Sequence, residues 1–158
     1  MSDEPEAHWS EQPAAADDRP SVHDRAAQLQ AMPVLGVVAQ RIADVSPAWA
    51  NVTVPASSAT GASVDGVSRD RAIGVEAIRE GWLLHRAASR VAAEASPDLA
   101  LLVGDWCYAA GLCEIADHGS LDDVARLATL VADVSARCDE SIETLAPRWA
   151  ETTDAMRA

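Results

Sequence analysis

The sequence contains no phenylalanine, no lysine and only one tyrosine, and each of these shortages excludes something. With so few aromatic rings, the 49% of apolar residues consists mostly of Ala, Val and Leu, a composition that suits closely packed helices. The 12 basic residues are scattered among 25 acidic ones, and the formal net charge is −13. Because nucleic acids and anionic membrane surfaces bind basic patches, this charge argues against both as partners.

Motifs for metal binding and nucleophilic catalysis are also missing. Cys107, Cys113 and Cys138 lack the close Cys-x-x-Cys spacing of a zinc site, and adding His118 does not supply it. We expect these cysteines to be reduced, buried thiols and not a disulfide framework. No glycine-rich phosphate loop follows a strand, and no Gly-x-Ser-x-Gly elbow is present. The sequence therefore predicts no catalytic residue, no metal ligand and no cofactor bound by this chain.

The ends of the chain differ in composition from its middle. Residues 1–20 are rich in Asp, Glu, Pro and Ala, which predicts a disordered acidic tail, and no signal-peptide pattern precedes the apolar residues, so we expect a cytoplasmic location. Residues 21–146 are predicted to form one helical domain, with a long loop at about 46–67 that is rich in Ser, Ala, Gly and Thr. Because Pro147 interrupts the helical pattern, residues 147–158 are expected to be a C-terminal tail or a short helix.

The stretch Ser96–His118 is predicted to be the central helix of this domain. Ser96 suits its N-cap and Gly119 its C-terminal end. Within Leu99–Cys113 the only charge is Asp105, and the apolar residues fall on every side of a helical wheel, so the helix has to be covered on all sides. The helix is about long enough to span a bilayer, but the charge in its middle and the polar residues at its end oppose insertion. We therefore expect no transmembrane segment.

Asp105 is the ionisable residue that most needs an explanation. A carboxylate within an apolar helix requires a partner or a raised pKa, and an Arg, a His or a backbone donor would serve as that partner. Within this chain the candidate partners are Arg86 and Arg90. His85 lies near an apolar stripe and is expected to be a satisfied core histidine and not a catalytic one.

Helical spacing of apolar residues predicts the other helices of the domain. One is expected over about 68–95 and another over about 120–145, on either side of the central helix. Pro33 separates two shorter ones, His23–Met32 and Val34–Val45. The pattern as a whole predicts an all-α fold, a helical bundle.

Two of these helices resemble the trans-polyprenyl diphosphate synthase family. The segment Val75–His85, VEAIREGWLLH, is similar to the family helix that ends in Leu-Ile-His before its first aspartate-rich motif. The segment Leu101–Ala110, LLVGDWCYAA, is similar to the family's Leu-Ala-Gly-Asp-Tyr-Leu helix. The resemblance covers residues 73–145 and implies a truncated isoprenoid-synthase fold. The positions that match the family's motifs are His85, Gly104 and Asp105.

The departures from the family are as informative as the matches. The family places two aspartates directly after the His to hold Mg²⁺ against a diphosphate, whereas this chain has Arg86 and Ala87. The second aspartate-rich motif lies on a later helix that this sequence does not contain, and the family's Gly-Lys-x-Arg diphosphate clamp has no counterpart near Leu35–Val37. The resemblance therefore implies a non-catalytic small subunit of a heteromeric synthase. Its catalytic partner would carry the Mg²⁺ and, with it, make long prenyl tails for quinones such as menaquinone, as a heterodimer or a larger assembly.

The family builds its dimer interface largely from the helices that match residues 97–145. Helical spacing puts four residues of the central helix on one stripe, and we expect these to bind the partner: Leu102, Trp106, Ala110 and Cys113. Three others are expected to face the chain's own core: Leu101, Tyr108 and Leu112. A hypothesis from another class remains open, a self-associating helical adaptor or ligand-binding bundle unrelated to prenyl chemistry.

Overall fold

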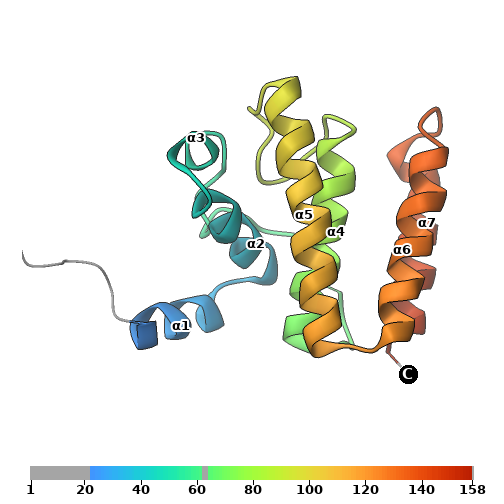
Figure 1. Cartoon of the computed structure of the whole chain (residues 1–158), viewed down its shortest axis with the longest axis horizontal. Helices are drawn as coiled ribbons and strands as arrows, with labels where there is room; N and C mark the ends of the chain where they lie inside the picture. Colours follow the sequence, from blue (N-terminus) through green and yellow to red (C-terminus); the bar gives the residue numbers. More distant parts are fainter. Residues whose placement is uncertain (1–21, 62–63, 158) are drawn as a thin grey trace, which may run out of the picture. The chain divides into compact units, whose positions relative to one another are not determined.

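The structure, a computed structural model, describes residues 22–61 and 64–157, and the regular elements among these are all helices (Figure 1). The predicted all-α fold class is confirmed, whereas the expected tail over 1–20 lies outside the described residues. The chain divides into two compact units, Met1–Gln30 and Ala31–Ala158, and everything below concerns the second. The helices are α1 Val22–Ala31, α2 Val34–Ala43, α3 Pro47–Ala50, α4 Arg69–Leu84, α5 Pro97–His118, α6 Leu121–Ala136 and α7 Ile142–Ala155.

Serine side chains begin most of these helices. The Oγ of Ser96 accepts the backbone N–H of Leu99, and α5 then runs from Pro97 to His118, as the sequence predicts. At α6, Ser120 and Asp123 cap each other's backbone N–H groups, which satisfies two donors that the helix itself leaves unpaired. The side chains of Ser46, Ser68 and Ser141 each accept one backbone N–H at the start of the helix that follows, as Ser96 does.

Helices α4 and α5 lie side by side and cross backbone against backbone (Figure 1). A Cβ on Gly111 would lie 2.6 Å from the carbonyl oxygen of Gly74, and a Cβ on Gly81 would lie 2.8 Å from that of Gly104. The two glycines of each helix are seven residues, or about two turns, apart, so the antiparallel helices touch at two successive points. This close approach fixes the register of the pair.

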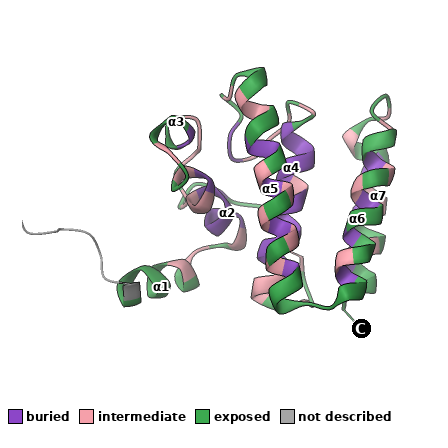
Figure 2. Ribbon diagram, in the orientation of Figure 1, coloured by how far each residue is buried: buried purple, intermediate pink, exposed green. Residues whose placement is uncertain are grey.

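The main core lies among α4, α5, α6 and α7, and its buried residues are among those drawn purple in the ribbon of Figure 2. Its aromatic centre is Trp82 of α4 against Trp149 of α7, with ring centroids 5.5 Å apart. On the other side of α4, helix α2 buries its apolar face. The buried residues of α2 are Leu35, Gly36, Val37, Val38, Ala39 and Ile42.

Helix α4 ends at Leu84, about ten residues before the predicted end near Ala95. The chain reverses there, with Ala87 at φ +53°, a conformation that L-residues other than glycine seldom adopt. The following turn still buries Val91, whose carbonyl accepts the backbone N–H of Val54. Val91, whose apolar spacing predicted a longer helix, is buried, but it lies in a turn that folds back on the bundle and not in a helix.

The predicted helix over 120–145 is two helices, α6 and α7, separated by a turn at Arg137–Ser141. Residues 147–155, expected to be a tail or a short helix, form the later part of the 14-residue α7, so Pro147 lies inside a helix and does not end one. A proline in the second turn removes one N–H and kinks or weakens a helix, but the core contacts of Trp149 and Met156 outweigh this. The predicted loop at 46–67 likewise contains the short helix α3.

Candidate functional site

Within the part of the chain that the structure describes, helix α5 is fully buried only along the side that faces α4. Its buried residues are Val103, Gly104, Cys107, Gly111 and Ile115, all on the side that faces α4. On the opposite side Leu102 is 57% exposed, and the stripe continues at spacings of three and four through exposed residues (Figure 2). These are Asp105, Ala109, Cys113 and Ala116. Residues 31–61 and 64–157 leave this mostly apolar side of α5, the exposed α5 face, uncovered.

The structure divides the four residues predicted to bind a partner. Leu102 and Cys113 lie on the exposed α5 face, but Trp106 and Ala110 turn towards α2 and α3 of the same chain. The Trp106 ring meets Trp49 of α3 edge to face, with centroids 5.8 Å apart. Helical spacing alone could not show that α2 and α3 lie on this side. Both residues are half-buried, and their contact with a partner stays a prediction.

The residues predicted to face the core also need one correction. Tyr108 and Leu112 are half-buried and pack against the main core, as expected. Leu101 is 51% exposed instead, because it lies in the second turn of α5, beyond the reach of α6 and α7. It extends the apolar surface beside Leu102.

The three family-motif positions lie together, although they come from two helices. His85 caps the end of α4, and its Nε2 is 3.2 Å from Oδ1 of Asp105. Gly104 makes this approach possible, since a Cβ there would lie 2.3 Å from the His85 ring. The Asp105 side chain is 74% exposed, so solvent screens this contact and makes it weak.

Neither arginine predicted to pair with Asp105 does so. Arg86 donates to the backbone carbonyls of Cys138 and Glu140 and stacks over Trp82, 5.5 Å from the ring centroid. It therefore ties the end of α4 to the connection between α6 and α7. The prediction assumed that Asp105 points into the bundle, whereas α5 presents it to solvent.

Arg90 belongs to a buried ion-pair network that the sequence analysis missed. Its Nη2 is 2.6 Å from Oε2 of Glu76, its Nε binds Oε1 of Glu80, and its backbone N–H donates to the second oxygen of Glu80. Burial opposes the charge of Arg90, but the carboxylates of Glu80 and Glu76 outweigh it and raise the pKa of the guanidinium. Ser89 adds a hydroxyl donor to Glu80 at 2.9 Å. The network fastens the turn after α4 onto α4.

The cysteines are free, but only Cys107 is buried as predicted. Cys113 and Cys138 are exposed, so the expectation that all three are buried is wrong. Burial, and secondarily the charge of Glu80, raises the pKa of the Cys107 thiol to about 12. Burial also raises the pKa of the neighbouring Tyr108 to about 12, although a hydrogen bond to Ser135 opposes the shift. Both groups are therefore neutral at ordinary pH.

Acidic side chains do not gather into a metal-binding site in the part of the chain that the structure describes. No group of three His, Cys, Asp or Glu side chains there could hold a metal ion. Where the family has its first aspartates, Arg86 and Ala87 form the turn after α4. The two buried acids nearby, Glu76 and Glu80, are held by Arg90.

Helix α5 is long and apolar enough to cross a membrane, judged by length and composition alone, and no other helix within 22–61 and 64–157 is. The central helices of soluble proteins pass the same test, so this is a weak indication. The expectation that the chain has no transmembrane segment stays a prediction.

No protein-family model, no curated protein and no solved structure matches this chain. The fold defines an all-helical protein, and the resemblance of residues 73–145 to polyprenyl diphosphate synthases stays an expectation from the sequence.

Proposed function

We propose that this chain is the non-catalytic small subunit of a heteromeric long-chain trans-polyprenyl diphosphate synthase. It acts in the cytoplasm beside a catalytic subunit, in the synthesis of quinone side chains such as that of menaquinone. The observation that carries the proposal is the exposed α5 face, which runs through Leu102, Ala109 and Cys113 in the region that resembles the family's interface helices. A helix of the partner, packed along this face, would cover the apolar side that the chain leaves open.

The arrangement of the two similar segments supports the proposal. The segments Val75–His85 and Leu101–Ala110 lie on neighbouring antiparallel helices, and the contact of His85 with Asp105 joins their motif positions. A chance likeness in two unrelated stretches would not require them to pack against each other. The contact therefore favours the view that both segments derive from one ancestor of the polyprenyl diphosphate synthase family.

The chemistry of the chain supports a non-catalytic role. Ionising an allylic diphosphate needs several carboxylates that converge on hard cations, together with basic groups for the leaving diphosphate. Arg86 and Ala87 stand where the family has its first acids, and Arg90 engages the buried Glu76 and Glu80. The proposal therefore assigns Mg²⁺ binding and catalysis to the partner.

The proposal predicts that the purified chain catalyses no prenyl transfer by itself but changes the activity of the catalytic subunit. With Mg²⁺, isopentenyl diphosphate and an allylic diphosphate, the chain alone should show no prenyl transfer. Added to the catalytic synthase from the same cell, the chain should raise the rate of that synthase by about tenfold or more over its rate alone, or lengthen its products. Radiolabelled product analysis measures both quantities.

Two outcomes would contradict this function. Turnover by the chain alone would show that it is itself a catalyst, although Arg86 and Ala87 stand where the family has its first aspartates. A rate and a product length that stay the same at a saturating amount of this chain would exclude the subunit role.

The alternative, a self-associating helical adaptor, draws on the same surface. Ala109 and Ala116 are small and exposed, so two copies of α5 could approach closely across a twofold axis. This alternative predicts a dimer of the chain alone and no effect on any synthase. Sedimentation of the isolated chain distinguishes the two functions, because the small-subunit proposal expects a monomer until the partner is added.

A further inference from the structure

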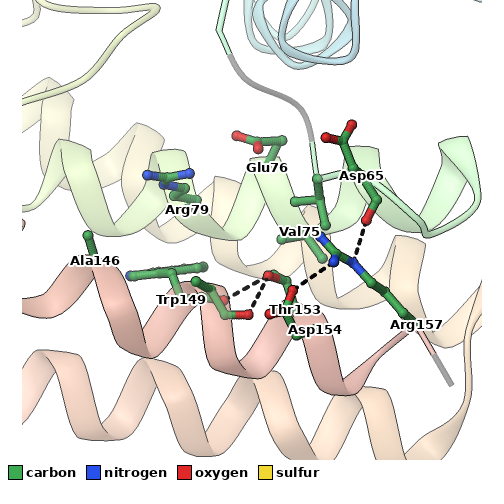
Figure 3. A pocket seen from close by; sticks show the side chains of 11 residues that line it. Asp65, Val75, Glu76, Arg79, Ala146, Trp149, Thr153, Asp154 and Arg157 are labelled. Atoms are coloured by element: carbon green, nitrogen blue, oxygen red, sulfur yellow. Dashed lines mark hydrogen bonds and ion pairs between the residues drawn. The ribbon is translucent and has the colours of Figure 1, made fainter.

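A polar pocket of about 230 Å³ opens between α4 and α7, away from the exposed α5 face (Figure 3). Helix α4 contributes Glu76 and Arg79 to its wall, and α7 contributes Trp149. Arg157 is committed at one end, because its Nε donates to the carbonyl of Asp65 at 2.7 Å and its Nη1 pairs with the Asp154 carboxylate at 3.0 Å. Glu76, Arg79 and Trp149 are therefore the residues that can bind a ligand in this pocket.

Three buried polar atoms of this pocket lack a hydrogen-bond partner among the residues that the structure describes. They are Oε1 of Glu76, Nε of Arg79 and Nε1 of Trp149. Only five buried side-chain N or O atoms among the described residues share this condition, so their gathering in one pocket is a specific feature of the fold. Buried polar groups are nearly always hydrogen-bonded in folded proteins, which makes this cluster a site that awaits complementary groups.

The charges near the pocket define which groups would complement it. The network beside it holds two carboxylates, Glu76 and Glu80, against the single guanidinium of Arg90, a formal balance of minus one. Oε1 of Glu76 is therefore a buried acceptor that favours a cation. Arg79 makes no hydrogen bond or ion pair in the described part of the chain, and with the Trp149 indole it offers donors to an anion.

We propose that this pocket binds a small zwitterion of the α-amino acid class. The ammonium group donates to Glu76, the carboxylate accepts from Arg79 and from Trp149, and an aliphatic side chain packs against the apolar part of the wall. That part is formed by Val75, Ala146 and Ala150. The volume suits a ligand of this size, and the site does not depend on the proposed function of the α5 face.

The indole N–H resonance of Trp149 reports on this site directly in the full chain. We expect L-leucine, added up to about 10 mM, to shift this resonance in a saturable manner, while the resonance of Trp106 stays unchanged. N-acetylleucine lacks the ammonium group and leucinamide lacks the carboxylate, so each should bind about tenfold more weakly or worse. The variant Trp149→Phe assigns the resonance.

A variant of Arg79 gives the matched test, because Arg79 has no partner in the fold to lose. Arg79→Gln should weaken leucine binding by about tenfold or more, whereas Arg126→Gln, at an exposed arginine of α6, should leave it unchanged. The proposal is overturned if no standard amino acid produces a saturable shift, or if Arg79→Gln or leucinamide binds as leucine binds to the native chain. The first outcome would leave the pocket without an amino-acid ligand, and either of the others would show that a contact between Arg79 and the carboxylate does not determine binding.

Discussion

Gly111→Ala is expected to lower the free energy of unfolding by about 3 kcal/mol, at the upper end of the cost of overpacking. The added Cβ would lie 2.6 Å from the carbonyl oxygen of Gly74 and 2.6 Å from Cγ1 of Ile78. One of these atoms is backbone of α4, so the helices must move apart along a closely packed seam. Alanine gains about 1 kcal/mol of helix propensity over glycine, which is too little to offset the clash.

Chemical denaturation followed by far-ultraviolet circular dichroism measures this loss. Gly61→Ala is the control, because among the described residues its Cβ would meet two side-chain ends and no backbone atom: Cδ2 of Leu35 at 3.2 Å, which can yield, and Nη1 of Arg90 at 3.6 Å, an ordinary contact distance. The control should change the free energy of unfolding by less than about 1 kcal/mol. If Gly111→Ala is as stable as the native chain, the backbones of α4 and α5 are not in contact at this point.

Arg90→Met is expected to lower the free energy of unfolding by about 3–5 kcal/mol. The variant would leave the carboxylates of Glu76 and Glu80 buried without a cation, and it would release the turn that follows α4. The cost comes from the two stranded acids and much less from the lost methylene packing, since methionine retains most of that packing. Replacing both acids by glutamine in the Arg90→Met background should therefore recover a large part of the loss.

Arg137→Met provides the comparison for this network. Arg137 also binds two carboxylates, those of Asp133 and Glu140, but on the surface of the protein. Because solvent screens such pairs, this variant should lose far less stability than Arg90→Met. Equal losses for the two arginine variants, in urea denaturation of the full chain, would show that burial of the Glu76–Arg90–Glu80 network contributes nothing.

The sequence predicted the elements that local chemistry determines. Helix α5 has the predicted bounds because Ser96, Pro97 and Gly119 act on their nearest neighbours. The predictions failed where distant contacts outweigh a local signal. Pro147 is a strong helix breaker by itself, yet the core contacts of Trp149 hold α7 continuous through it.

The candidate surface was predicted in part, for the same reason. The uniform apolar character of α5 indicated that it needs cover, but not which of its sides the chain covers itself. Trp106 was assigned to a partner because nothing in its spacing reveals Trp49, 57 residues earlier. The pocket beside Glu76 was not predictable, since one of its walls is α7, where a tail was expected. Its detectable signal was the acidic pair Glu76 and Glu80, which interrupts an apolar helix face at a spacing of four.

The most direct test of the proposed function is the affinity of the chain for the catalytic synthase when the exposed α5 face carries a charge. Ala109→Arg adds a good helix former at an exposed position, so the variant should fold and melt as the native chain does. In the complex the guanidinium would be buried without a partner, and we expect about 100-fold weaker binding, whereas Ala155→Arg, at an exposed position of α7, should bind as the native chain does. Calorimetric titration that shows Ala109→Arg binding the synthase as tightly as the native chain would contradict the account.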